Sequence, residues 1–296
     1  MPNKIAFIGL GEAASAIISG LGDDLPPRIS AYDIKSDDPG TAPEIENRAA
    51  GLGITCCACS ADAIGDADIV FCTVTADQAL SAAETGARHI RTGAYWCDLN
   101  SCAPSSKQAA SEMINAAGGR YVDVAVMAPV HPGLNMVPCL LSGPHAETIA
   151  PELSDLPMNV RVVGDAVGRA SSIKMIRSVM VKGMEALTAE CALAAVAAGV
   201  EDEVIPSLAK GQWGLDVAAR AGYNFERSLR HGLRRAAEMD EVTRTLADLG
   251  LPNGMASETA DWQRRIAESG ANVPPEGEDT DYRQIAQELL ALMRRA

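Results

Sequence analysis

Positive charge and long apolar runs are both scarce in this sequence. The 296 residues include 25 Lys and Arg against 39 Asp and Glu, a net charge of −14. So acidic a surface repels nucleic-acid phosphates and anionic lipid headgroups. No apolar run reaches the roughly 20 residues that a membrane-spanning helix needs. These absences predict a soluble protein that binds neither nucleic acid nor membrane.

Aromatic residues are also few, and the cysteines form no framework. Aromatics make up 4% of the chain, whereas hydrophobic residues make up 47%, which is typical of a globular enzyme rather than a disordered or fibrous chain. The eight cysteines are spread over expected strands and helices, which predicts reduced thiols and a cytoplasmic location. Cys56 and Cys59 have C-x-x-C spacing, but no second pair or nearby His completes a ligand set, so we expect no metal.

The chain divides into an alternating part and a helical part. Apolar runs typical of strands, at 4–8, 28–32, 53–57, 68–74, 95–99, 120–126, 138–142 and 160–163, alternate with helical segments. This order predicts a mostly parallel, doubly wound sheet covered on both faces. After Gly164 no strand pattern follows. Residues 169–198 form one long apolar helix that could lie fully buried, as a spine between domains or subunits. The fold class is therefore α/β, with an all-α domain at 165–296 after the sheet domain at 1–164.

The first strand runs directly into the turn Gly9-Leu10-Gly11-Glu12-Ala13-Ala14, which has the G-x-G-x-x-A pattern. Gly9 would permit the tight turn, Gly11 would let a pyrophosphate approach the backbone, and Ala14 would let helix and strand pack closely. The helix that follows offers unpaired N–H groups to the phosphates. Residues 1–21 also loosely imitate a signal peptide, but a signal peptide needs no glycines at fixed positions. The turn therefore predicts a Rossmann-type dinucleotide site.

Asp33 indicates which dinucleotide binds there. It closes the second strand, close to the roughly 20 residues after the turn at which a carboxylate accepts hydrogen bonds from the adenosine ribose. Its negative charge would repel a 2′-phosphate, and no Arg follows it directly. NAD is therefore favoured over NADP, although Lys35 partly offsets this preference.

With these features the chain resembles the β-hydroxyacid dehydrogenases, the family of 3-hydroxyisobutyrate and 6-phosphogluconate dehydrogenases. Thr73-Val74-Thr75 matches the family's loop after the fourth strand, and Asn100-Ser101-Cys102-Ala103-Pro104 sits where the family has Ser-Thr-x-x-Pro beside the nicotinamide. The resemblance implies cofactor contacts for Thr73, Val74, Thr75, Asn100 and Ser101. It also implies a homodimer, as does the long apolar helix.

Lys174 is the residue that the resemblance makes catalytic. Gly168-Arg169-Ala170-Ser171-Ser172-Ile173-Lys174 matches the family's Gly-x-Gly-x-x-x-Lys, whose lysine is the general acid/base at the substrate hydroxyl. Among Ile173, Met175 and Ile176 the lysine is expected to be partly desolvated, which disfavours its charged form. The alternative is a helix lysine whose charged end merely reaches solvent.

The expected substrate residues depart from the family pattern. In Asp123–Pro129 the family's serine is Met127, and Ala128 and Pro129 replace two glycines; proline has no N–H to offer a substrate. Beyond Lys174 the family's Asn or His and Asn are Arg177 and Ser178, and the Lys-Asp-Leu segment is replaced by a basic stretch around His231. His131 sits on a loop that could line the cleft. The expected substrate contacts are Val126, Met127, Ala128, Arg177, Ser178 and His231.

The sequence therefore predicts an NAD-dependent oxidoreductase that transfers a hydride between nicotinamide and a small hydroxy acid, with Lys174 as general acid/base. A bulkier acid than 3-hydroxyisobutyrate would suit Met127. One alternative is an imine or other carbonyl reductase, a group that usually lacks this lysine. Another is a non-catalytic dinucleotide-binding protein.

Overall fold

The computed structural model describes residues 4–22, 28–210, 217–275 and 281–293. The chain divides into two compact units, Met1–Met175 and Ile176–Ala296. The first contains a sheet covered by helices and the second is helical, so the predicted fold class is confirmed. The predicted domain boundary at 164 coincides with the end of the last strand and stays a prediction.

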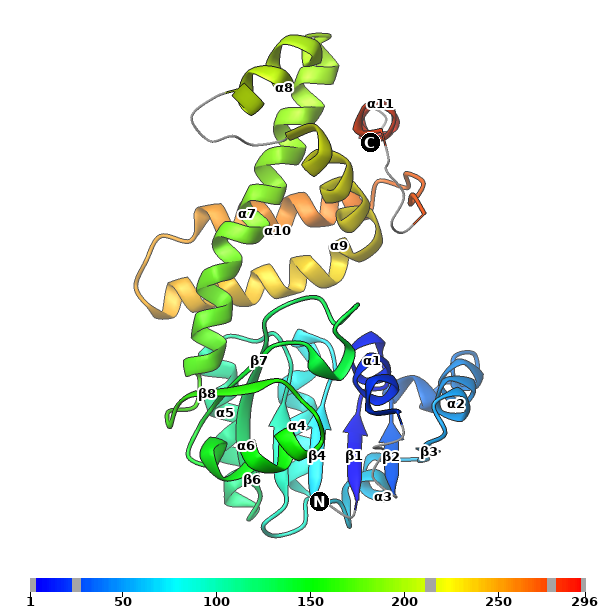
Figure 1. Ribbon diagram of the computed structural model, residues 1–296, viewed down its shortest axis with the longest axis vertical. Helices are drawn as coiled ribbons and strands as arrows, with labels where there is room; N and C mark the ends of the chain where they lie inside the picture. The colour runs from blue at the N-terminus through cyan, green and yellow to red at the C-terminus, as the bar shows by residue number, and fades with distance from the viewer. Residues whose placement is uncertain (1–3, 23–27, 211–216, 276–280, 294–296) are drawn as a thin grey trace. The chain divides into compact units, whose positions relative to one another are not determined.

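An eight-stranded sheet forms the centre of the first unit (Figure 1). Its order is β3-β2-β1-β4-β5-β6-β7-β8, and all neighbours pair in parallel except β6 and β7. The β6–β7 connection contains only a short 3₁₀ helix, Leu134–Met136, and antiparallel strands need no crossover helix. The strands are β1 (Ile5–Ile8), β2 (Ile29–Tyr32), β3 (Thr55–Cys56), β4 (Ile69–Cys72), β5 (Tyr95–Asp98), β6 (Arg120–Val126), β7 (Cys139–Ser142) and β8 (Val160–Gly164).

Alternate strand residues point to opposite faces of this sheet and build two cores. Phe7 and Phe71, whose ring centroids lie 5.1 Å apart, belong to the core beneath α1 (Glu12–Leu21), α2 (Ala42–Gly51) and α6 (Ala146–Asp155). Trp96 and Tyr121 belong to the core beneath α3 (Ser60–Ile64), α4 (Ala79–Ala87) and α5 (Pro104–Ala116). Both faces are covered, as the near-continuous apolar strands predict.

The sequence pattern does not locate two of the connecting helices, α2 and α6. Of the ten residues of α2, only Ile45 and Ala49 are buried, so its apolar periodicity is too weak to recognise. The α6 helix contains Pro151, a residue that normally argues against a helix interior.

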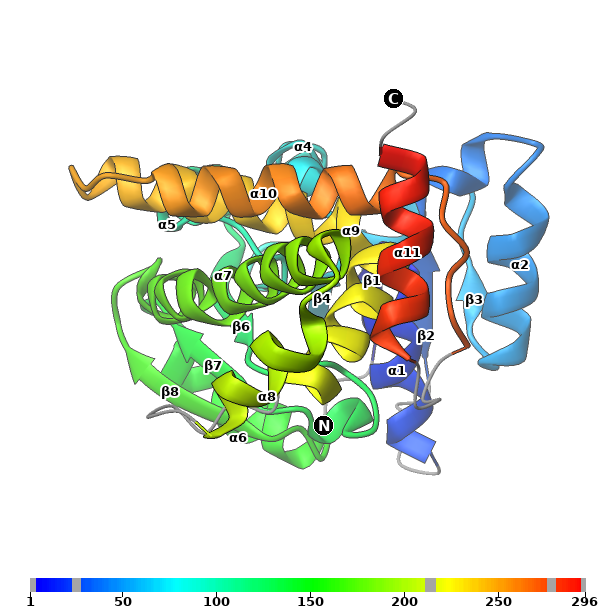
Figure 2. The ribbon, with the colours of Figure 1, turned by 90° about the horizontal axis from the view of Figure 1, so that it is seen from above.

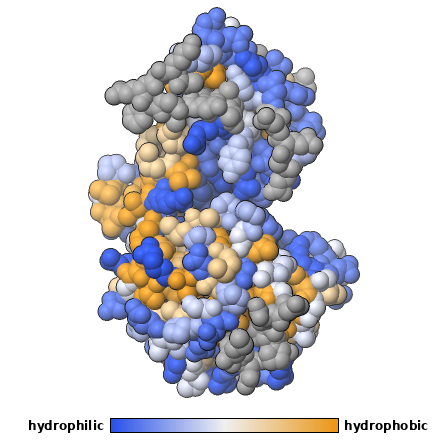
Figure 3. Space-filling view, in the orientation of Figure 1, coloured by the Kyte–Doolittle hydropathy of each residue, from blue (hydrophilic) through white to orange (hydrophobic). Residues whose placement is uncertain are grey.

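The second unit is built from long helices. It contains most of α7 (Arg169–Ala198), then α8 (Glu201–Lys210), α9 (Val217–Asp248), α10 (Gly254–Ala267) and α11 (Tyr282–Met293), and α9 packs along α10 (Figure 2). Within the single chain α7 is not fully buried, because Ile176, Met180 and Leu187 are 51%, 67% and 50% exposed; a spine between subunits stays a prediction. Apolar residues reach the surface among hydrophilic ones (Figure 3). No helix in the described ranges is long and apolar enough to span a bilayer.

Candidate dinucleotide and lysine site

The glycine turn after β1 has the geometry that its sequence predicts. Gly9 has φ +89°, and a Cβ added there would lie 2.7 Å from the Thr73 carbonyl oxygen, so only glycine fits. Gly11 has φ −85°, and a Cβ added there would meet nothing within 4 Å. Gly11 also begins α1 without a side-chain cap. Open space at an uncapped helix N-terminus fits a dinucleotide pyrophosphate.

Asp33, the residue after β2, also binds the backbone of the glycine turn. One carboxylate oxygen accepts a hydrogen bond from Leu10 N at 2.8 Å, and the other accepts one from Lys35 N at 3.0 Å. The carboxylate is therefore held next to the turn, as a ribose-binding acid must be. Its support of the turn's backbone could not be predicted from the residue pattern.

Thr73 and Arg48 support the same turn from two sides. Thr73 Oγ1 donates to the Gly9 carbonyl oxygen at 2.7 Å, and Arg48 Nη1 donates to the Leu10 carbonyl oxygen at 2.6 Å. Arg48 also pairs with Glu44 on α2, a helix that the sequence pattern missed. Val74 is half-buried and Thr75 is exposed in the same loop.

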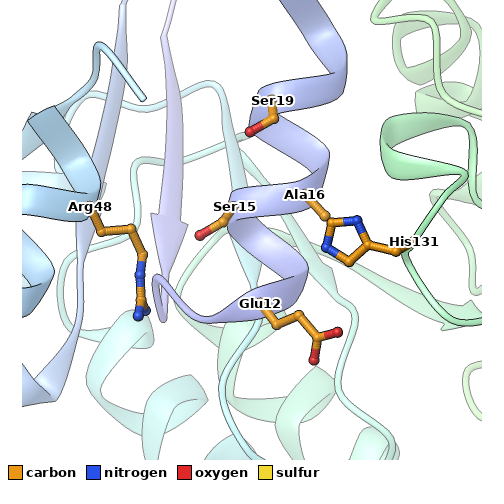
Figure 4. A pocket seen from close by; sticks show the side chains of 6 residues that line it. All are labelled: Glu12, Ser15, Ala16, Ser19, Arg48 and His131. Carbon is orange, nitrogen blue, oxygen red and sulfur yellow. The ribbon is translucent and has the colours of Figure 1, made fainter. Parts of the chain in front are cut away.

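A hollow of about 300 Å³ lies beside the N-terminal half of α1 (Figure 4). His131, from the loop after β6, faces α1 across this hollow, on the same side of the helix as Glu12. Arg48 and Ser15 lie on the other side of α1. The hollow is lined by Glu12, Ser15, Ala16, Ser19, Arg48 and His131.

Lys174 meets the segment that follows β5. Its Nζ donates to Ser101 Oγ at 2.6 Å, and both residues are half-buried. The charge of Lys174 also influences the Cys139 thiol. Burial raises the pKa of Cys139 to about 11, and the positive charge of Lys174 lowers this pKa in part. Two sequence motifs 73 residues apart are thus joined by one contact.

Asn100, next to Ser101, is anchored by its neighbours. Its side-chain nitrogen donates to Asp98 Oδ1 at 2.7 Å and to Cys72 Sγ at 3.2 Å. Its side-chain oxygen is buried and has no hydrogen-bond partner among the described residues. This unpartnered acceptor belongs to the residue before Ser101, and a ligand amide or hydroxyl could satisfy it.

The expected substrate residues fall into two groups. Met127 packs against the cluster of Ala125, Leu140 and Ala170, which places the end of β6 beside the start of α7. The Met127 backbone N–H donates to the Pro138 carbonyl oxygen at 2.8 Å. It therefore cannot take the place of the N–H groups that the family's glycine loop offers to a substrate. Val126 is half-buried and Ala128 is exposed.

The other three expected substrate residues belong to the second unit. Arg177 is exposed and Ser178 is buried on α7, and His231 is half-buried on α9. Because all three lie outside the first unit, which holds the dinucleotide turn and Lys174, their part in the substrate site stays a prediction. The described ranges bring no three His, Cys, Asp or Glu side chains together in a metal-binding group.

Family models match two separate parts of the chain. Residues 4–93 match "NADP oxidoreductase coenzyme F420-dependent", and residues 195–266 match "Domain of unknown function (DUF1932)". The first match contains the glycine turn, Asp33 and Thr73. The second lies within the helical unit.

Two solved structures are similar along nearly their whole length. A conserved hypothetical protein of Sinorhizobium meliloti 1021 is 37% identical, covers 99% of this chain and 97% of its own, and has a TM-score of 0.73. The conserved protein MTH1747, described as structurally similar to 3-hydroxyacid dehydrogenases, is 30% identical over 89% of this chain and 97% of its own, with a TM-score of 0.66. Mycobacterium tuberculosis 3-hydroxyisobutyrate dehydrogenase shares the fold, with 15% identity, a TM-score of 0.72 and coverage of 98% and 99%.

The turn, the sheet and the first family match together define a dinucleotide-binding oxidoreductase fold. The chain belongs to the β-hydroxyacid dehydrogenase family, in a divergent branch whose helical unit carries the DUF1932 match. This confirms the family that the sequence motifs indicated.

Proposed function

We propose that this protein is an NAD-dependent oxidoreductase that interconverts a small hydroxy acid and its carbonyl form, with Lys174 as the general acid/base. The hydrogen bond between Lys174 Nζ and Ser101 Oγ carries the proposal. It holds a proton-transfer group beside the segment that, in the family, lines the nicotinamide.

Bound NAD would supply the hydride acceptor. In the oxidation direction the substrate O–H proton passes to Lys174 Nζ as the C–H hydrogen leaves with its electron pair. Ser101 accepts a hydrogen bond from Lys174 Nζ. This bond fixes the orientation of Nζ and therefore of the side that faces the substrate. Gly11 and the first turn of α1 would hold the pyrophosphate, and Asp33 the adenosine ribose.

Three further expectations belong to this proposal. The Asp33 carboxylate favours NAD over NADP, because a 2′-phosphate beside it would meet a like charge. The change from the family's serine to Met127 favours a substrate bulkier than 3-hydroxyisobutyrate. The exposed apolar side chains of α7 support a homodimer.

The test measures NADH formation over a panel of hydroxy acids, phosphorylated sugar acids and cyclic amines. With an active substrate, Lys174→Ala should lose about 100-fold or more in kcat and keep its affinity for NADH, since general acid/base groups contribute about 10²–10⁴. Lys4→Met serves as the control. Lys4 pairs with Asp66 and lies just before the amino end of β1, whereas Ser101 follows the carboxyl end of β5.

Undiminished turnover in Lys174→Ala refutes the lysine's role. If the wild-type protein binds NADH but turns over no member of the panel with either dinucleotide, the non-catalytic alternative replaces this proposal.

A further inference from the structure

A buried lysine, Lys107 on α5, lies between two buried aspartates in the first unit. Its Nζ donates to the Asp98 carbonyl oxygen at 2.7 Å and to Asp98 Oδ1 at 2.8 Å, and lies 3.7 Å from Asp123 Oδ1. All three side chains are at most 1% exposed. Neither the sequence motifs nor the proposed reaction accounts for this group.

The sheet register explains why these charges meet. Asp98 of β5 is paired with Asp123 of β6, Asp123 with Ser142 of β7, and Ser142 with Gly164 of β8. These residues form one row across four strands. Lys107 reaches the row from α5, which covers this face of the sheet.

One end of the row fixes the position of Ser101. Asp98 Oδ1 accepts hydrogen bonds from the backbone N of Asn100 at 3.0 Å and from its side-chain nitrogen at 2.7 Å. These two bonds set the path of the chain as it leaves β5. Ser101 is the next residue along that path.

The other end fixes the start of α7. Asp123 Oδ2 accepts hydrogen bonds from the backbone N of Gly168 and of Ser171, both at 3.1 Å, and Asp123 Oδ1 accepts one from Ser171 Oγ at 2.6 Å. The carboxylate thus binds the first turn of α7, where N–H groups lack helical partners. Lys174 lies one turn further along the same helix.

Lys107 stays charged in this position. Burial alone would lower its pKa, but the Asp98 and Asp123 carboxylates outweigh burial and raise it. Without the lysine, two carboxylates would face each other in the interior and repel. The ammonium group is what lets both aspartates occupy their positions together.

We propose that Lys107 is a positioning residue for the Lys174–Ser101 pair, holding both partners through Asp98 and Asp123. This inference rests on the proposed function, because it concerns the same lysine. Lys107 acts on this pair through the carboxylates of Asp98 and Asp123, which its ammonium group holds.

The test compares Lys107→Met, Lys174→Ala and the double variant with an active substrate. Lys107→Met should lower kcat about 10-fold or more while the Kd for NADH changes less than about 3-fold. In the Lys174→Ala background the same substitution should lower the residual kcat less than about 2-fold, because residues that act as one unit are not additive. A general loss of folding would instead lower kcat by the same factor in both backgrounds.

A milder variant covers the case in which Lys107→Met does not fold. Ser171→Ala removes one hydroxyl that binds Asp123 and leaves no buried charge unpaired. It should lower kcat at least 3-fold with unchanged NADH affinity. Ser30→Ala on β2 is the matched control: it also removes a buried serine hydroxyl, but one that donates to the Ala63 carbonyl oxygen at 3.1 Å and not to Asp98 or Asp123, and it should change kcat less than 2-fold.

The outcomes separate the two proposals. If Lys174→Ala turns over like the wild type, the proposed function fails. If Lys174→Ala loses turnover but Lys107→Met and Ser171→Ala do not, or if their losses multiply with that of Lys174→Ala, the positioning role is overturned and the proposed function stands.

Discussion

Substitution by alanine should change different properties at Gly9 and at Gly11: protein stability at the first and NADH affinity at the second. A Cβ at residue 9 would lie 2.7 Å from the Thr73 carbonyl oxygen and 2.9 Å from its carbon, at φ +89°. The left-handed backbone costs about 1–2 kcal/mol for a residue with a Cβ. The overlap with backbone atoms adds about 1–3 kcal/mol, as overpacking does. Gly9→Ala should therefore lower the free energy of unfolding by about 2–5 kcal/mol.

Gly11→Ala has no such cost. Its φ of −85° suits any residue, and the added Cβ meets nothing within 4 Å. Reduced freedom of the unfolded chain stabilises by about 0.4–1 kcal/mol, and the poorer helix N-cap that alanine makes offsets a similar amount. Stability should stay within about 0.5 kcal/mol of the wild type. If the pyrophosphate occupies the open space, NADH affinity should fall about 10-fold or more.

Urea unfolding and titration of NADH fluorescence measure the two effects separately. The expected pattern is a large loss of stability only in Gly9→Ala, and a loss of NADH affinity without loss of stability in Gly11→Ala. Equal destabilisation of the two variants would refute the steric argument. Unchanged NADH affinity in Gly11→Ala would show that the pyrophosphate does not lie at this turn.

Two further predictions concern charge. Asp33→Asn keeps an acceptor for Leu10 N but removes the charge, so the ratio of NADP to NAD affinity should rise about 10-fold; a wild-type protein that binds NADP more tightly than NAD contradicts the cofactor proposal. Burial raises the pKa of the Cys72 thiol from 9.0 to about 12, so the folded protein keeps a proton that the unfolded chain releases. This stabilisation is fully present below pH 9 and is lost as the pH rises to 12. The Tm measured between pH 8 and pH 11 should fall less steeply in Cys72→Ala, and identical slopes would exclude this contribution.

The sequence revealed those parts of the site whose chemistry is local. Gly9, Gly11 and Asp33 lie in one strand-turn-helix-strand unit, where each residue type answers a requirement of the backbone or of the phosphate. Lys174 was indicated by a motif and not by physics, since an isolated helix lysine is more often solvated. Its partner Ser101 could be named as a cofactor residue but not as a contact of the lysine.

The supports of the site could not be predicted in the same way. Arg48 lies on a helix whose two buried residues give too little periodicity to detect. Lys107 did leave a signal, because it shares a helical stripe with the buried residues Ala110, Ser111 and Ile114. A lysine on the apolar side of a helix implies a buried partner, yet its partners Asp98 and Asp123 are fixed only by the strand register.

The reversal of β7 explains how one sheet brings these groups together. Gly9, Asp33, Thr73 and Ser101 all follow the carboxyl ends of parallel strands, which meet at one edge. Because β7 runs the other way, its first residue, Cys139, lies at that edge opposite Val126. Ser142 is then the residue that pairs with Asp123, and its hydroxyl accepts a hydrogen bond from Ala170 N at 3.0 Å. The antiparallel strand thus helps to bring α7, and with it Lys174, to the sheet edge where the dinucleotide turn lies.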